Sequence, residues 1–444
     1  MNQDLGPLPD AIRRRSAPPP QRNRRQIVAA ILLVTLIAAA VAVAATRGGK
    51  AATSPDTSYD GTIYIESNRA APNENSVLAF RYRDGNLRPL NVREYLTGGS
   101  GSHDLSNHGV LDAEQQVVTN ADRTLLFAPN AGSDTVAVFH IAGDGTLTAV
   151  KGSPFPSLGK APASVGVSGD ELFVANKAQD GARPLKTTPA SYATFRIGGD
   201  GRLTPIGSPV EAPAGASPTQ TYVPPHTGHL MIATEESGPF RAFTIAGDGR
   251  LAQAPGSPLE LDARVFPGGK RTRRPRVWPQ GLVAHPRQPL IYAGVANIRR
   301  LVVYRYDASG RLEFVSSQLN RGTYLPCWTQ VNRAGTRLYT GNAGSQNISV
   351  FDIEHDPLHP RQIQRVTLRG LGLPWNFQLD PTGRFLFIIN MRAVRDIPSG
   401  RGNTLHSFGI GSDGRLTELA SSPVPIPVPL NTNPWGMAIV PRSR

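Results

Sequence analysis

The sequence is built from one unit that occurs seven times along the chain. Each unit has an apolar stretch such as LFVAN, then an alternating stretch such as VAVFHI, then a turn of the form GDGxL. A period of roughly 50 residues is typical of a propeller or a solenoid, in which each unit buries its apolar faces only against its neighbours. The seven copies are residues 62–87, 123–147, 170–203, 228–251, 289–312, 337–358 and 384–416.

Within a unit the pattern predicts β-strands. The stretch VAVFHI (136–141) alternates with a period of two and is rich in β-branched and aromatic residues, which favour strands. The Asp-Gly that follows supplies the positive φ of a tight hairpin turn. No segment after residue 50 has a sustained apolar period of 3.6 residues. We therefore expect an all-β fold.

Each unit also opens with a shorter strand that follows a proline. The clearest are residues 218–225, 279–286, 326–333 and 374–381. Four antiparallel strands per unit and seven units predict a seven-bladed β-propeller over residues 58–441. A solenoid is the alternative, but its two exposed ends would need capping.

The C-terminal end predicts closure of the ring. Residues 434–441 (PWGMAIVP) reproduce the opening strand of a unit, whereas the first unit begins at Tyr59 without one. We expect 434–440 to complete the blade begun by 59–66, because closure protects the edges of the sheets.

The first fifty residues predict export. Residues 27–46 contain no charge and, at about 1.5 Å per residue, match the hydrocarbon thickness of a bilayer as one helix. Six arginines precede this stretch, so the positive-inside rule places the propeller outside the cytoplasm. We expect a basic cytoplasmic tail (1–26), a transmembrane signal anchor or cleaved signal peptide (27–46) and a polar linker (47–57). Residues 23–28 (NRRQIV) also resemble a twin-arginine signal.

Charge and cysteine content narrow the possible sites. The net charge of +14 is spread along the chain apart from the N-terminal tail and a basic cluster at 264–276. That cluster is either solvated loop charge or an anion-binding surface, and the absence of interleaved aromatics argues against nucleic acid as a partner. The single cysteine, Cys327, excludes an intrachain disulfide and a multi-cysteine metal site.

The seven copies, the recurrent DGxLT turn, the Cys327-Trp328 pair and Thr234-Glu235 resemble the lactonase-type seven-bladed propellers with YVTN-type repeats. That family includes bacterial 6-phosphogluconolactonases and fungal carboxy-muconate cyclases. The resemblance covers about 58–441. We also expect a monomeric propeller without a cofactor. Repeats are evidence for fold, whereas a reaction depends on the site.

The resemblance implies a catalytic set of one His, one Glu and two Arg facing the central channel. In this chain the residue after each opening proline, or its equivalent, is neither His nor Arg. These residues are Gln115, Ala163, Thr219, Gln280, Cys327, Trp375 and Trp435. The second strands are expected to end mainly at asparagines, namely Asn68, Asn130, Asn176, Asn342 and Asn390, with Thr234 and Val295 in the other two units.

Glu235 is the residue that resembles the family's glutamate, and it is our candidate catalytic base. Repulsion from Glu236 would raise its pKa, and Arg276 is a candidate to stabilise the oxyanion. His103 and His108, in the insertion between the first two units, are alternative acids or bases. The competing interpretation is a Glu235 satisfied by a backbone turn and histidines in surface loops.

All four tryptophans fall in opening segments. They either fill the gaps between blades or offer aromatic faces to a sugar or another flat ligand in the channel. The ligand-contact candidates are Gln115, Thr219, Gln280, Cys327, Trp328, Trp375, Asn376 and Trp435. We expect no metal site, because no H-E-x-x-H, cysteine pair or EF-hand pattern occurs.

Two functions are consistent with these observations. The first is a membrane-anchored or exported lactonase-like hydrolase that acts on the lactone of a sugar or aromatic acid. The second is a non-catalytic propeller outside the cytoplasm that binds a glycan or an envelope protein.

Overall fold

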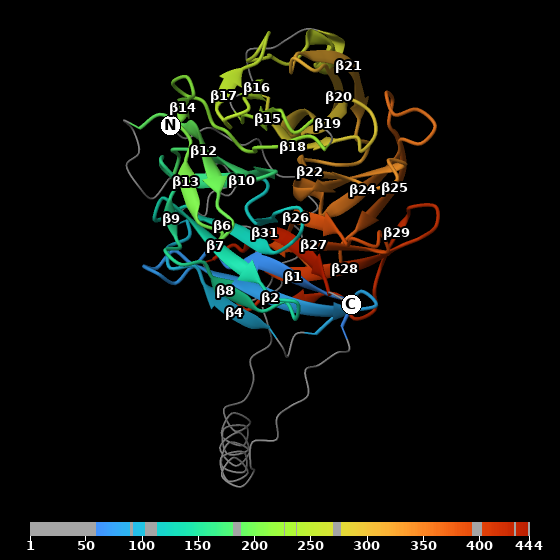
Figure 1. Ribbon diagram of the computed structural model, residues 1–444. Helices are drawn as coiled ribbons and strands as arrows, with labels where there is room; N and C mark the ends of the chain where they lie inside the picture. The colour runs from blue at the N-terminus through green and yellow to red at the C-terminus, as the bar shows by residue number, and fades with distance from the viewer. Residues whose placement is uncertain are drawn as a thin grey trace, which may run out of the picture. The chain divides into compact units, whose positions relative to one another are not determined.

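The computed structural model describes residues 59–88, 92–102, 113–180, 188–225, 227–236, 238–269, 277–392, 402–429 and 432–442. Residues 58–444 form one compact unit, in which seven antiparallel sheets follow one another around a ring (Figure 1). The predicted seven-bladed all-β propeller is therefore confirmed. Blades are numbered here in chain order.

Blade 1 contains the last strand of the chain and the first four, namely β31 (Trp435–Pro441), β1 (Gly61–Glu66), β2 (Ser76–Arg83), β3 (Asn86–Leu87) and β4 (Arg93–Leu96). Blade 2 consists of β5 (Val118–Thr119), β6 (Leu125–Asn130), β7 (Thr135–Ile141), β8 (Leu147–Ala149) and β9 (Phe155–Pro156). Blade 3 consists of β10 (Pro162–Ser168), β11 (Glu171–Asn176), β12 (Ser191–Ile197), β13 (Leu203–Pro205) and β14 (Val210–Glu211).

Blade 4 consists of β15 (Leu230–Thr234), β16 (Phe240–Ile245) and β17 (Leu251–Gln253). Blade 5 consists of β18 (Pro279–Ala284), β19 (Leu290–Val295), β20 (Arg300–Tyr306) and β21 (Leu312–Leu319). Blade 6 consists of β22 (Pro326–Val331), β23 (Arg337–Asn342), β24 (Asn347–Asp352) and β25 (Arg361–Thr367). Blade 7 consists of β26 (Leu373–Leu379), β27 (Phe385–Met391), β28 (Thr404–Ile410), β29 (Leu416–Glu418) and β30 (Val424–Pro425).

Short 3₁₀ helices lie in three connections. They are η3 (Ala263–Val265), η4 (Pro267–Gly269), η5 (Ala296–Ile298) and η6 (Ala343–Ser345). Among the residues described, no helix has the length and apolar character needed to cross a membrane. The predicted segment 27–46 lies outside the described residues.

The ring closes as predicted. The last strand, β31, pairs antiparallel with β1, with Ile63 opposite Ile439 and Tyr64 opposite Ala438. In Figure 1 the red end of the chain accordingly lies beside the blue first strand. The spare C-terminal strand thus becomes the inner strand of blade 1.

The second strand of most blades is buried on both faces. Every residue of β1, β6, β15, β19 and β23 except Arg337 is buried. Each sheet is covered by a neighbouring blade on either side, so both faces of these strands carry apolar side chains. This explains why the LFVAN-like stretches read as continuous apolar runs.

Blade 4 departs from the four-strand prediction, because its opening stretch makes only isolated bridges, from Pro218 to Glu235 and from Tyr222 to Ile232. Between them the backbone N–H of Thr221 donates to the side chain of Ser164 in blade 3. Proline also has no N–H to give to a ladder. The opening stretch of blade 4 therefore forms no regular ladder with β15, because Pro218 lacks an N–H and the N–H of Thr221 is bonded to blade 3.

Gly281 tests how tightly the inner strands pack. It has a φ of 64°, and a Cβ there would overlap the carbonyl oxygen of Cys327 in blade 6. Gly383 has a φ of 73° with open space around it. We expect Gly383→Ala to cost about 1–2 kcal/mol for left-handed backbone alone, and Gly281→Ala to cost at least about 2 kcal/mol more from the overlap.

Urea unfolding of both variants measures this difference. Equal losses of unfolding free energy in the two variants would contradict the close packing of blades 5 and 6.

Candidate functional site

The inner strands of the propeller meet one another across its axis. The Gln220 side chain of blade 4 donates to Oε1 of Gln115 at 2.8 Å. Nδ2 of Asn376, in blade 7, donates to Oε1 of Gln116 at 3.0 Å. Two of the predicted ligand contacts, Gln115 and Asn376, therefore already have partners within the chain.

Glu114 extends this contact to blade 5 and adds a second bond to blade 4. It stands where the opening segments of most other units have proline, and its Oε1 accepts a hydrogen bond from the backbone N–H of Gly281 at 2.9 Å. Its own backbone N–H donates to the carbonyl of Thr219 at 2.8 Å. The predicted channel is thus occupied at this level by polar side chains of the protein itself.

The tryptophans beside the axis are packed in the core. The rings of Trp328 and Trp375 lie 4.0 Å apart between centroids, at 46°, and both belong with Trp435 and Ala163 to the largest apolar cluster. Each of the three tryptophans is at most 4% exposed. This packing favours the interpretation that they fill gaps between blades.

Some polar atoms in this region nevertheless have no hydrogen-bond partner. They are the indole nitrogens of Trp328 and Trp375 and both side-chain polar atoms of Gln280. Buried polar groups usually find a partner in protein or ordered water. These three residues lie in the inner strands of blades 5 to 7, as does the buried Cys327. Their unpaired polar atoms can still bond to a water or a ligand.

The predicted base, Glu235, lies in an ion pair just after β15. Its Oε1 accepts from Nε of Arg241 on β16 at 2.6 Å and from the Tyr192 hydroxyl on β12 at 3.2 Å. Burial and the Glu235 carboxylate raise the pKa of Tyr192. Burial alone would lower the pKa of Arg241, but the hydrogen bond and charge of Glu235 outweigh it and raise that pKa. The Glu235 carboxylate is therefore bound by the side chains of Arg241 and Tyr192. The backbone carbonyl of Glu235 also accepts a hydrogen bond in a turn, from the N–H of Gly238.

A second buried ion pair lies beside the first. Nζ of Lys177, the residue after β11, is 3.1 Å from Oε2 of Glu236, and the Ser217 hydroxyl donates to the same oxygen at 3.2 Å. The Lys177 side chain is fully buried. Since Glu235 and Glu236 are adjacent, two carboxylates and two cations meet where the second strands of blades 3 and 4 end.

These four side chains, Lys177, Glu235, Glu236 and Arg241, are here called the ionic cluster. A carboxylate can accept a proton from water, and a buried cation can stabilise an oxyanion. Buried charges with specific partners also mark candidate functional sites.

Sequence reasoning found Glu235 by resemblance but missed both cations. Lys177 follows the expected strand end at Asn176, and Arg241 lies in an alternating stretch, so neither had a signal of its own.

Three predicted candidates, Arg276, His103 and His108, lie outside the described residues. Of the basic cluster, Arg264 is described. It forms an ion pair with Asp262 at 2.8 Å, and its guanidinium lies over the ring of Phe314.

Sequence analysis also missed Glu66. The second strand of the first unit ends at Glu66 and not at the expected Asn68. The carboxyl is fully buried and accepts a hydrogen bond from Asn75 at 2.6 Å. Burial raises its pKa to about 8, although Asn75 and the neighbouring Trp435 indole lower it. Glu66 is therefore largely protonated at neutral pH.

One group of possible metal ligands occurs in the described part of the chain, at the end of β24. It comprises Asp352, Glu354 and His355. Nη1 of Arg337 lies 3.3 Å from Asp352 and 3.0 Å from Glu354, and Arg361 lies 3.2 Å from Asp352. The two arginines already neutralise these carboxylates, so the group is described as an ion-pair network.

Comparison with solved structures identifies similar propellers. Putative 6-phosphogluconolactonases from Bacteroides fragilis and Bacteroides uniformis match with TM-scores of 0.60 and 0.62 and identities of 16% and 15%, over 87% and 86% of this chain and 100% of theirs. The periplasmic gluconolactonase of Pseudomonas aeruginosa matches with a TM-score of 0.61 at 16% identity, over 85% of this chain and 99% of its own.

No protein-family model and no curated relative matches the sequence. The resemblance to lactonase-type propellers is thus confirmed as a likeness of fold, and identities this low carry no reaction to this chain.

The raised pKa of Glu66 predicts a pH dependence of stability. The folded protein binds this proton up to about pH 8, whereas an unfolded chain releases it near pH 4.5. Stability is therefore lost as pH rises between these values. We expect Glu66→Gln to remove this loss, which is on the order of 5 kcal/mol because one pKa unit is worth about 1.4 kcal/mol. Urea unfolding from pH 4.5 to 9 measures it.

Glu418 provides a control of opposite sign. Burial would raise its pKa, but hydrogen bonds from His406, Arg369 and Ser422 lower it. Its stabilising effect is present above the unfolded pKa and is lost as pH falls. If the unfolding free energies of wild type and Glu66→Gln changed in parallel with pH, the pKa of Glu66 would be the same in the folded and unfolded states, which contradicts the prediction.

Proposed function

We propose that this protein is a lactonase-like hydrolase that acts on the lactone of a sugar or aromatic acid at the ionic cluster. The observation that carries the proposal is the pairing of Glu235 with Arg241 and of Glu236 with Lys177, all four side chains being buried. Each pair supplies a carboxylate and a cation, which are the two kinds of group that lactone hydrolysis requires.

The reaction needs no cofactor. A water oxygen attacks the lactone carbonyl carbon while a carboxylate of the cluster takes the water proton. Arg241 or Lys177 stabilises the negative charge on the carbonyl oxygen. When the tetrahedral intermediate collapses, the ring C–O bond breaks, and the leaving alkoxide receives the proton back. The products are a hydroxyl group and a carboxylic acid, and the acid then releases its proton to solvent and becomes a carboxylate. In this scheme Arg276 is a further candidate to bind an anionic substrate.

The place of action that we propose is outside the cytoplasm. Support comes from the sequence, in which the uncharged residues 27–46 come after six arginines. Such an order keeps the N-terminus inside and exports the part of the chain beyond the apolar segment. The protein is then a monomeric propeller, either anchored by 27–46 or released after cleavage.

A non-catalytic binding role is the second candidate. It is favoured by the axis, where Glu114, Gln115 and Asn376 are bonded to other blades. None of these three axial residues is the His or Arg of the family pattern. In this role a glycan or an envelope protein is bound, with Thr219, Gln280, Cys327, Trp328, Trp375 and Trp435 as the remaining contact candidates.

A lactone-hydrolysis screen of the full-length protein tests the first candidate. We expect Glu235→Gln and Glu236→Gln each to lower kcat by a factor of about 100 or more, since general acid–base catalysis contributes about 10²–10⁴. The matched control is Asp170→Asn, which removes the exposed partner of Arg196 in blade 3 and should leave hydrolysis unchanged.

Removing one partner of a buried pair can unfold a protein. The double variant Glu235→Gln/Arg241→Gln removes both charges and keeps the test decisive if the single variant fails to fold. Turnover that survives in folded variants at both glutamates, or no turnover of any lactone by folded wild type, would exclude hydrolysis at the ionic cluster.

A further inference from the structure

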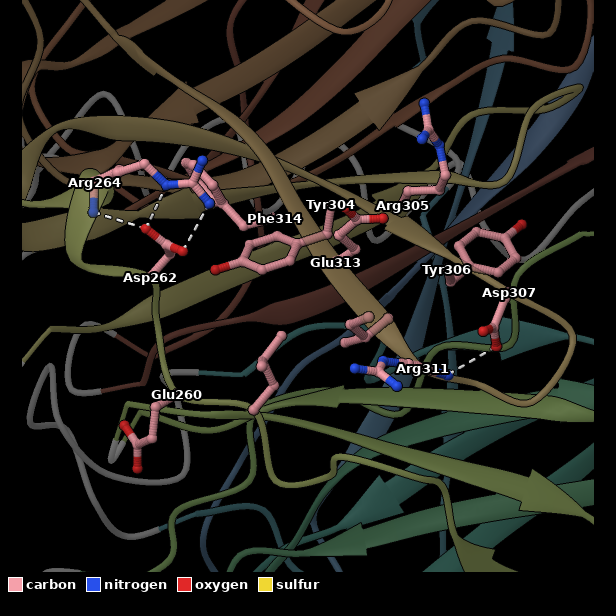
Figure 2. Close-up of a pocket in the computed structure, with 12 residues that line it drawn as sticks. Glu260, Asp262, Arg264, Tyr304, Arg305, Tyr306, Asp307, Arg311, Glu313 and Phe314 are labelled. Carbon is pink, nitrogen blue, oxygen red and sulfur yellow. Dashed lines mark hydrogen bonds and ion pairs between the residues drawn. The ribbon is translucent and has the colours of Figure 1, made fainter.

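A pocket lies at the outer strands of blade 5, and none of the residues that line it belongs to the ionic cluster. It has a volume of about 620 Å³ and is formed by β20, β21 and the segment 259–264 that follows blade 4 (Figure 2). Ligand sites typically have volumes of roughly 300–1,000 Å³. The pocket is therefore large enough for one or two sugar rings.

The floor of the pocket contains an unsatisfied hydroxyl group. Tyr304 is 1% exposed, and the proton of its hydroxyl has no acceptor in the protein, although the hydroxyl oxygen receives a hydrogen bond from the backbone of Asp262. Figure 2 shows this hydroxyl pointing toward the side of the pocket that Asp262 lines. Leaving a buried hydroxyl unpaired costs about 1–3 kcal/mol, so a ligand that supplies an acceptor would recover that free energy.

Aromatic rings in the wall are held in fixed orientations. Phe314 meets Tyr304 edge-on, with centroids 5.5 Å apart and an angle of 74° between the planes. The guanidinium of Arg264 lies 4.5 Å from the centre of the Phe314 ring and is fixed by Asp262. Tyr306 also lines the pocket and is 7% exposed. Rigid aromatic surfaces of this kind suit the flat apolar faces of sugar rings.

Charged side chains in the wall alternate in sign. Arg305 stands opposite Glu313 across β20 and β21, and the backbone of Arg311 donates to Asp307. With Glu260, Asp262 and Arg264, the lining residues carry three positive and four negative charges. A nearly balanced lining disfavours strongly ionic ligands but offers many donors and acceptors to a ligand rich in hydroxyl groups.

We propose that this pocket is a binding site for a neutral oligosaccharide, with the Tyr304 hydroxyl donating to a sugar oxygen and Phe314 packing against a ring. The site is separate from the proposed lactonase site and does not depend on it. In a protein exported from the cytoplasm, such a site would hold the propeller on a glycan surface.

Two tyrosines of blade 5 form a matched pair for the test. Tyr304→Phe removes the hydroxyl whose proton has no acceptor, whereas Tyr292→Phe removes a hydroxyl that donates to the carbonyl of Pro357 at 2.9 Å. Both substitutions keep the buried ring. Maltohexaose and cellohexaose serve as probes, titrated calorimetrically into the full-length protein in a detergent without a sugar headgroup.

We expect at least one hexaose to bind wild type and Tyr292→Phe equally. Tyr304→Phe should bind it about three- to tenfold more weakly, the effect of one hydrogen bond, without losing thermal stability. Arg264→Gln removes the guanidinium that lies over the ring of Phe314. This variant gives a second measurement, and its affinity for the sugar should also differ from that of wild type.

Absence of binding by both hexaoses at about 10 mM would overturn the proposal. Equal affinities of wild type, Tyr304→Phe and Arg264→Gln would overturn it as well, since the sugar would then bind elsewhere. An arginine-rich hexapeptide that binds while the hexaoses do not would show that the carboxylates select the ligand, which contradicts a saccharide site.

Discussion

The pairing of β31 with β1 is the interaction on which the rest of the structure depends. It joins residues 61–66 to 435–441 and so converts a row of seven sheets into a ring. Without it, blade 1 would lack its inner strand, and the sheets at the two ends would expose apolar faces and strand edges. Blades 2 to 7 are each built from local sequence. This pairing therefore joins the two ends of the row, so that blades 1 and 7 also have a neighbour on both sides.

Closure also brings the inner strands together at the axis. Glu114 and Gln116 of blade 2 reach Gly281 of blade 5 and Asn376 of blade 7. Such contacts are possible only if all seven blades keep their radial positions, because a shift of one blade would break bonds to several others. The axis thus supports the ring, and polar side chains of the protein occupy it at this level.

The fold could be predicted from the sequence because the pattern that specifies a blade occurs seven times. Seven copies of the same alternating stretch and Asp-Gly turn indicate the same blade, and the spare strand at 434–440 matches the vacancy at 59–66. Blade 4 could not be predicted fully, since the stretch after Pro218 looks like the other opening strands. Its ladder is interrupted by a hydrogen bond from Thr221 to Ser164, which depends on the neighbouring blade.

The candidate site could be predicted only in part, for the same reason. Glu235 carried a motif, but the identities of its partners Tyr192 and Arg241 depend on which side chains the packing of blades 3 and 4 brings together. Glu66 carried no motif, and its raised pKa results from burial that a single sequence does not show.

The ionic cluster is an unusual feature for a purely structural junction. Moving a carboxylate or an ammonium out of water costs several kcal/mol for each ion, and a good geometry within the pair only offsets this cost. Apolar residues of similar volume can satisfy such positions at least as well, as they do between blades 1 and 2 and between blades 2 and 3, where alanine, valine and phenylalanine fill the space. Stability therefore does not account for Lys177, Glu235, Glu236 and Arg241 at one junction. The proposed hydrolysis of a lactone would give these charges a role, because that reaction uses a carboxylate and a cation.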